Sequence, residues 1–181
     1  MKTTTTIFLI LFAFTLSSCG GRKAPEINFG NQENPLFGKT YKDIADIPEL
    51  REWQLRSGSV ISANKHEDGR FRFAFEEFND ADGNIVLLFV EFVGEHDERG
   101  HISRKILDSV NIQKCNKGSD FLSVMCRVNE ERDAEIVAVV FWEEREILRN
   151  VVRAWRANTN TGRFEMADVE DIDCVNEGYF G

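Results

Sequence analysis

The chain has 181 residues and a formal net charge of −9 at pH 7, with 22 lysine and arginine residues against 31 aspartate and glutamate residues. This length predicts one main domain with its own hydrophobic core. The acidic balance argues against nucleic acid as a partner, because phosphate binding needs clustered cations, and it favours a basic protein if the partner is chosen by charge.

The first residues have the pattern of an export signal. Lys2 precedes an apolar run over residues 7–14, and Leu16-Ser17-Ser18-Cys19 places small residues before a cysteine. The apolar run is too short to span a bilayer. The segment resembles the signal peptide and lipobox of bacterial lipoproteins, which implies removal of residues 1–18, lipid chains on Cys19, and a membrane-anchored place in the cell envelope facing the periplasm or the cell surface. The alternative is an ordinary secretory signal in which Cys19 is incidental.

Residues 19–37 are expected to form a tether, and residues 38–181 a single β-rich domain. The tether is rich in Gly, Asn and Pro and has no apolar periodicity. In residues 41–55, Ile44, Ile47 and Leu50 have near-helical spacing, which Pro48 interrupts. This predicts a short, broken helix that caps the core.

The following residues have the patterns of β-strands. Phe71, Phe73 and Phe75 alternate with other residues, as in a half-buried strand. Asp82-Gly83 is typical of a hairpin turn, and residues 85–90, apolar on both faces, predict a central strand.

The chain aligns with itself, by hydrophobic pattern, at a shift of about 63 residues. Residues 60–61, 71–78, 85–92 and 106–112 then match residues 123–124, 134–141, 148–155 and 169–172. The expected fold is therefore mainly β, with about eight antiparallel strands in a sandwich or small barrel, and the halves could be two related four-strand meanders. The alternative is an α+β fold with a helix near residues 143–156, where Ile147, Val151 and Trp155 follow a helical stripe.

Three cysteines remain once Cys19 is assigned to lipid: Cys115, Cys126 and Cys174. An odd number predicts one disulfide and one free thiol in an oxidising compartment. Residues 116–120 read as a turn, and Cys115 is much closer to that turn than Cys126, so these two would not face each other across a hairpin. This favours a Cys126–Cys174 bridge and leaves the other pairings open.

One loop combines groups that could bind a metal or transfer protons, namely Glu95, His96, Asp97, Glu98 and His101. The spacing matches no zinc motif, so a solvated loop between two strands is favoured. The adjacent pairs Glu76-Glu77 and Glu130-Glu131 would point to opposite faces of strands and are interpreted as surface charge. No cofactor or metal site is predicted.

The leading hypothesis for function is a lipid-anchored, non-enzymatic binding domain, with the membrane contacted through lipid on Cys19 and any small ligand left unknown. A sharper alternative is an inhibitor or immunity protein that captures a cationic, envelope-attacking enzyme through Glu95, Asp97, Glu98, Glu130 and Glu131. A second alternative is a structural component of an envelope assembly. An enzyme would centre on His96 and His101, but the sequence contains no catalytic motif.

Overall fold

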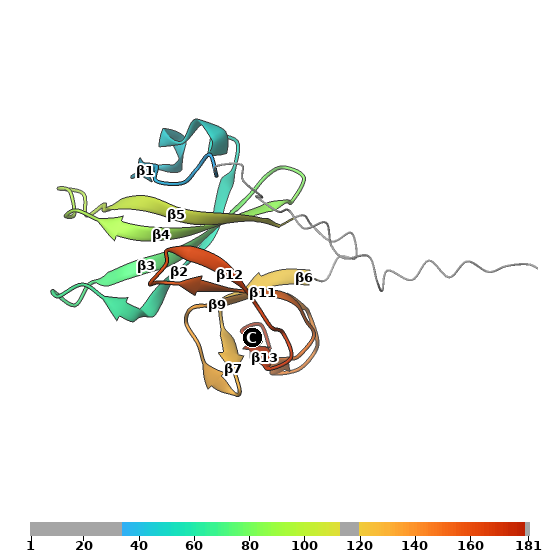
Figure 1. Ribbon diagram of the computed structural model, residues 1–181. Helices are drawn as coiled ribbons and strands as arrows, with labels where there is room; N and C mark the ends of the chain where they lie inside the picture. Colours follow the sequence, from blue (N-terminus) through green and yellow to red (C-terminus); the bar gives the residue numbers. More distant parts are fainter. Residues whose placement is uncertain (1–33, 113–119, 180–181) are drawn as a thin grey trace, which may run out of the picture. The chain divides into compact units, whose positions relative to one another are not determined.

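The computed structural model describes residues 34–112 and 120–179. In these residues thirteen strands form three antiparallel sheets, and the helices are two 3₁₀ turns (Figure 1). The predicted mainly β, antiparallel fold is therefore confirmed. Over the same residues, no helix combines the length and apolar character needed to cross a membrane. Cys19, Cys115 and residues 19–33 of the expected tether lie outside the described residues.

Sheet A has the strand order β1-β5-β4-β3-β2. Its strands are β1 (Thr40–Tyr41), β2 (Gln54–Lys65), β3 (Phe71–Asn79), β4 (Ile85–Val93) and β5 (Ser103–Ile112). Gly83, in the turn between β3 and β4, has a φ of 82°, which glycine adopts without a steric penalty. Strand β4 lies between β3 and β5 and is buried over residues 86–90, so the predicted central strand is confirmed.

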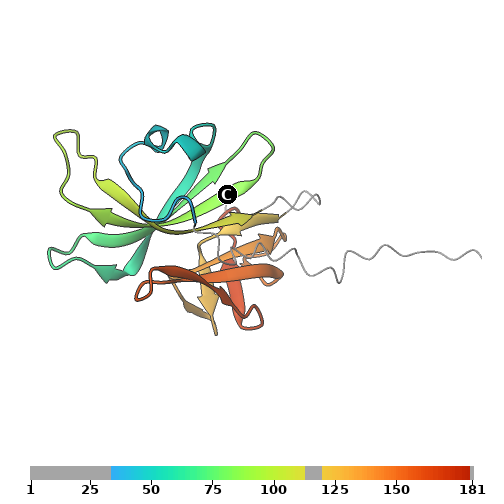
Figure 2. The ribbon, with the colours of Figure 1, turned by 45° about the horizontal axis from the view of Figure 1, so that its top comes forward.

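Sheet B has the strand order β12-β11-β9-β6. Its strands are β6 (Asp120–Ser123), β9 (Ile136–Phe141), β11 (Val151–Asn158) and β12 (Arg163–Ala167), and the β11–β12 hairpin is the orange and red ribbon of Figure 2. The alternative of a helix near residues 143–156 is wrong. The β-branched pair Val151-Val152 favours the extended backbone of β11, and a short strand, β10 (Ile147–Leu148), precedes it.

Sheets A and B contain meanders of the same form. Strands β2, β3, β4 and β5 pair in chain order, and so do β6, β9, β11 and β12. The predicted correspondence holds for the first three strand pairs. It is wrong for the fourth, because β12 ends at Ala167 and the predicted counterpart, residues 169–172, leads into a strand of the third sheet.

Sheet C has the strand order β10-β13-β7-β8 and is made of short strands. They are β7 (Cys126–Val128), β8 (Glu131–Arg132), β10 and β13 (Ile172–Val175). Cys126 and Cys174 are directly opposed in the β7–β13 ladder and are joined by a disulfide, as the sequence predicts.

Two hydrophobic clusters hold the three sheets together. The cluster between sheets A and B includes Phe75 and Phe89 from one sheet and Val137 and Trp155 from the other. A second cluster joins Ala138 and Ala154 of sheet B to the Cys126 and Ile172 region of sheet C. Because successive side chains of a strand point to opposite faces, a sheet covered on both sides needs central strands that are apolar throughout. Because one cluster joins sheets A and B and the other joins sheets B and C, the sheets pack as layers, which is the sandwich form of the predicted fold.

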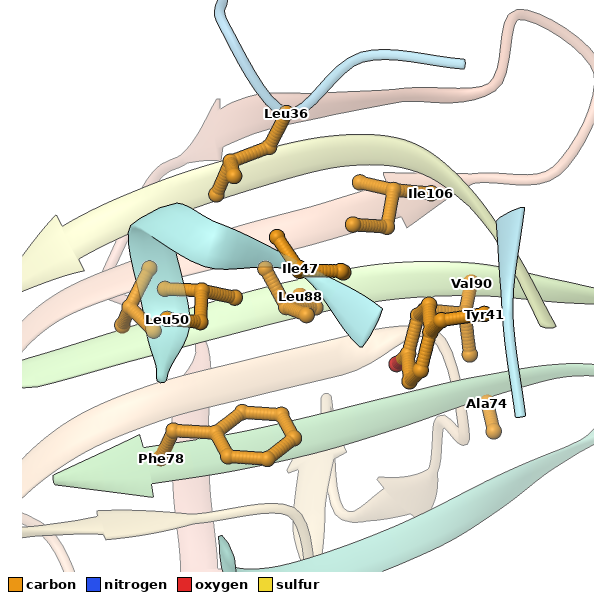
Figure 3. Close-up of a cluster of buried hydrophobic side chains, with 10 residues drawn as sticks. Leu36, Tyr41, Ile47, Leu50, Ala74, Phe78, Leu88, Val90 and Ile106 are labelled. Carbon is orange, nitrogen blue, oxygen red and sulfur yellow. The ribbon is translucent and has the colours of Figure 1, made fainter. Parts of the chain in front are cut away.

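The N-terminal segment covers the other face of sheet A. Ile47, between the two 3₁₀ turns, and Leu50, at the end of the second, pack in one cluster with Leu88 and Ile106 of sheet A (Figure 3). The predicted short helix is not found as one element. The segment forms two separate turns, η1 (Ile44–Asp46) and η2 (Pro48–Leu50), because Pro48 has no N–H to continue a helical hydrogen-bond series.

The described fold begins before residue 38, where the tether was expected to end. Leu36 is buried in the cluster beneath the 3₁₀ turns, and the Asn34 side chain donates a hydrogen bond to Ser109 Oγ at 3.0 Å. Residues 34–37 therefore belong to the folded domain.

Candidate functional site

A groove lies between the edge strands of two sheets. Strand β2 is an edge of sheet A and β6 is an edge of sheet B. Two adjoining cavities, of about 310 and 830 Å³, share Arg56, Glu77, Phe121 and Leu122 among their lining residues. We call this feature the β2–β6 groove. Its further lining includes Asn79, Asp120, Ser59, Val124, Trp142 and Glu177.

Glu77 lies in the floor of the groove and is only 7% exposed. It has the same strand phase as Phe73 and Phe75, so its side chain points to the face of sheet A that packs against sheet B. Ser57 Oγ donates to Glu77 Oε2 at 2.9 Å, and Arg56 Nε lies 3.5 Å from Oε1. Burial raises the pKa of the Glu77 carboxyl, while Ser57 and Arg56 act in the opposite direction.

Two buried oxygen atoms of residues that line the smaller cavity lack hydrogen bonds within the described residues. Asn79 Oδ1 and Asp120 Oδ1 are buried, and neither accepts a hydrogen bond from the part of the chain that the structure describes. Buried polar atoms are usually paired, because leaving one unpaired is costly. Asn79, Asp120 and Glu77 all line the smaller cavity, so its lining includes three side chains that carry acceptor oxygens.

The edge of β2 forms one side of the groove. The backbone N–H and C=O groups on its outer side are available for hydrogen bonds to another strand. Across residues 34–112 and 120–179, β2 pairs with β3 and with no other strand. The stretch from Ser57 to Asn64 contains neither a charged residue nor a proline. Sheet edges in natural proteins are usually blocked by such residues, so this edge is open to a further strand.

The structure does not bring the polar residues of the 95–101 loop together into one site. Lys42 Nζ donates to Asp97 Oδ2 at 2.9 Å, and this bond, with the backbone N–H groups of His101 and Arg99, holds the pKa of Asp97 at about 2. His96 instead lines a shallow apolar depression of about 240 Å³ beside Phe71. Glu95, Glu98 and His101 are exposed.

Glu130, in the β7–β8 turn, and Glu131, on β8, belong to the sheet C region, which sheet B separates from the 95–101 loop. Glu130 has a φ of 68° in the turn between β7 and β8 and lines a depression of about 330 Å³ with Arg149 and Asp171. Glu131 pairs with Val128 at the start of β8. The acidic residues expected to form one interaction surface are therefore divided between two sheets.

The interpretation of Glu76-Glu77 as surface charge is wrong, although the two side chains do point to opposite faces. Glu76 accepts a hydrogen bond from Tyr41 Oη, and Arg104 Nε lies 2.6 Å from Glu76 Oε1 without the alignment of a hydrogen bond. Both carboxylates are only 7% exposed. Glu76 thus anchors the N-terminal segment to sheet A, and Glu77 is left to the groove.

The sequence pointed to neither the groove nor its acceptor residues. The phase that Glu77 shares with Phe73 and Phe75 was a usable signal for its burial. Asn79 and Asp120 fall within the segments interpreted as turns, residues 79–84 and 116–120, and they line the same cavity only because sheets A and B pack together. Among the described residues, no three His, Cys, Asp or Glu side chains are placed to hold a metal ion. No protein-family model, no curated protein and no solved structure matches this chain.

Proposed function

We propose that this chain is a lipid-anchored protein of the cell envelope whose β domain binds a partner protein in the β2–β6 groove, without catalysing a reaction. The observation that supports this function is the groove itself, in which the edge of β2, unpaired within the described part of the chain, borders a cavity whose lining includes Glu77, Asn79 and Asp120. A protein partner can form hydrogen bonds both with the backbone groups of the strand edge and with the polar side chains of the cavity. Water forms such bonds poorly once these groups are buried.

The charge balance favours a basic partner. The chain carries a net charge of −9, and two of the acceptors in the groove belong to the carboxyl groups of Glu77 and Asp120. A cationic, envelope-attacking enzyme that is captured and inhibited is one partner of this kind. Attraction between opposite charges accelerates such an association and makes it sensitive to salt.

Crosslinking at defined positions tests the proposal. A photoreactive amino acid is placed at Ser59 or Val124 in the groove, and at Met166 as a control, in the full chain in its native envelope. Met166 is 69% exposed and lies on β12, the other edge of sheet B. We expect both groove positions to capture the same protein and Met166 not to capture it. If Met166 captures that protein as strongly, or if the groove positions capture nothing, the groove is not the binding surface.

A further inference from the structure

We infer that the β2–β6 groove receives an extended, basic peptide segment of the partner, which pairs as a strand with the outer edge of β2 and places a lysine or arginine side chain in the cavity of Glu77, Asn79 and Asp120. This inference rests on the proposed function and specifies the chemistry of the partner.

The edge of β2 determines the backbone conformation of the occupant. An extended segment that adds to a sheet edge satisfies the free N–H and C=O groups, and alternate side chains then point to the two faces of the sheet. Ser57, Ser59 and Ile61 lie opposite Glu77, Phe75 and Phe73 in the β2–β3 ladder, so one set of β2 side chains shares the groove face. A strand added to β2 places every second side chain on that same face.

The cavity determines the charge of the occupant. The side chains of Glu77, Asn79 and Asp120 in its lining carry acceptor oxygens, and Asn79 Oδ1 and Asp120 Oδ1 have no donor among the described residues. Lysine presents three N–H donors and arginine five, and neither presents an acceptor. An acidic side chain would meet like charge, and an apolar one would leave the buried acceptors unpaired.

Arg56 is the one cationic side chain among the residues that line the smaller cavity. It lies 3.5 Å from Glu77 and is 67% exposed, so it competes with an incoming cation from the rim of the cavity. Arg56 also has no partner residue in the β2–β3 ladder, because the register of that ladder shifts between Leu55 and Ser57. Removing this charge should therefore strengthen the binding of a basic peptide.

The experiment uses the full chain, purified from membranes in mild detergent, and an array of labelled peptides about ten residues long in an extended, threonine-rich background. The central position carries arginine, lysine, citrulline, glutamine or glutamate. We expect arginine and lysine peptides to bind at least about tenfold more tightly than their citrulline or glutamine counterparts. Equal binding of the charged and neutral peptides would overturn the inference.

Backbone pairing is tested with N-methylated forms of the arginine peptide. Because only alternate residues of an added strand bond to β2, methylation of one alternate set should abolish binding and methylation of the other should be tolerated. If both sets have the same effect, the peptide does not bind as a strand and the inference fails.

Protein variants test the location of the site. Glu77→Gln and Asp120→Asn should each weaken binding of the arginine peptide by about tenfold, and Arg56→Gln should strengthen it. Glu98→Gln removes one exposed carboxylate from the 95–101 loop and is the matched control, expected to leave binding unchanged. Glu77→Gln retains an acceptor for Ser57 Oγ, so we expect it to fold, and Asp120→Asn provides an independent test. A loss of binding in Glu98→Gln alone would place recognition at the loop and overturn the inference.

Failure of this inference differs from failure of the proposed function. If Ser59 and Val124 crosslink to a partner but no basic peptide binds, the groove remains a binding surface and the peptide inference is wrong. If neither crosslinks nor peptides are found, both are wrong.

Discussion

At the scale of single residues, the contact among Tyr41, Glu76 and Arg104 joins the N-terminal segment to sheet A. Tyr41 is 3% exposed and donates its hydroxyl hydrogen to Glu76 on β3, while the Arg104 guanidinium also lies over the Tyr41 ring, 5.7 Å from its centre. Burial raises the pKa of Glu76, and the hydrogen bond from Tyr41 and the charge of Arg104 oppose that shift. The buried carboxylate therefore depends on both neighbours.

We predict that Tyr41→Phe lowers the free energy of unfolding by about 1–3 kcal/mol near neutral pH, because it removes a donor from a buried acceptor. Since the folded pKa of Glu76 is raised, its contribution to stability is largest below its ordinary value of 4.5 and declines as the pH rises through the folded pKa. Loss of the Tyr41 hydroxyl raises that pKa further. The deficit of the variant should therefore be larger near pH 7.5 than near pH 4.

Urea unfolding of the wild type and the variant at the two pH values measures this difference. Lys42→Gln is a useful control, because it removes the partner of Asp97, whose pKa is lowered. The contribution of Asp97 is present above its unfolded pKa of 3.8 and is lost only as the pH falls toward about 2, so the deficit of Lys42→Gln should change little between pH 7.5 and pH 4. A deficit of Tyr41→Phe that is equal at both pH values would contradict the proposed role of its hydroxyl.

At the scale of elements, sheet C depends on connections between distant parts of the chain. Its two-residue strands β8 and β10 make few ladder hydrogen bonds, and its central strands β7 and β13 are joined by the Cys126–Cys174 disulfide across a sequence separation of 48. Arg127 and Asp173 reinforce the same ladder with two hydrogen bonds, of 2.6 and 2.8 Å. A covalent link is most effective where it closes a long loop of the unfolded chain.

We predict that the double substitution Cys126→Ala and Cys174→Ala lowers the free energy of unfolding by roughly 2–4 kcal/mol. Cys115→Ser should have little effect, since Cys115 is the expected free thiol. Chemical unfolding with and without a reductant checks both statements, because the reductant should destabilise the wild type and leave the double variant unchanged. A large effect of the reductant on the double variant would point to a different disulfide pairing.

The elements differ in how well local sequence predicts them. The alternation through Phe73 and Phe75 and the apolar run of β4 predicted strands correctly, because side-chain periodicity follows directly from backbone geometry. The spacing of Ile44, Ile47 and Leu50 correctly marked residues that face the core, as Ile47 and Leu50 are buried and Ile44 packs against them. It could not distinguish an α-helix from two 3₁₀ turns, since both place these side chains on one face.

At the scale of the whole molecule, the stacking of three sheets and the groove between two of them were beyond the reach of sequence reasoning. Hydrophobic pattern shows that a strand face is covered, but not which sheet covers it. The groove depends on β2 and β6 both being edges, a property of pairing order and not of either segment. The disulfide was the exception, because an odd number of cysteines and one turn already favoured a single pairing.

The proposed lipid anchor also concerns the molecule as a whole. We predict that Cys19→Ser abolishes metabolic labelling with a palmitate analogue and moves the protein from the membrane fraction to the soluble fraction, because several acyl chains on Cys19 would provide stable attachment. Cys115→Ser is the matched control and should retain both label and membrane attachment. Retention of the label in Cys19→Ser would reject the lipoprotein interpretation.

The order of the strands along the chain has a consequence for biosynthesis. Sheet A is complete once Ile112 has emerged, because β1 to β5 come entirely from the first part of the domain. Its inner face, which carries Phe73, Phe75 and Phe89, stays open until β9 and β11 of sheet B follow. A chain made from its N-terminus therefore passes through a stage with an uncovered aromatic surface, which is a condition for aggregation.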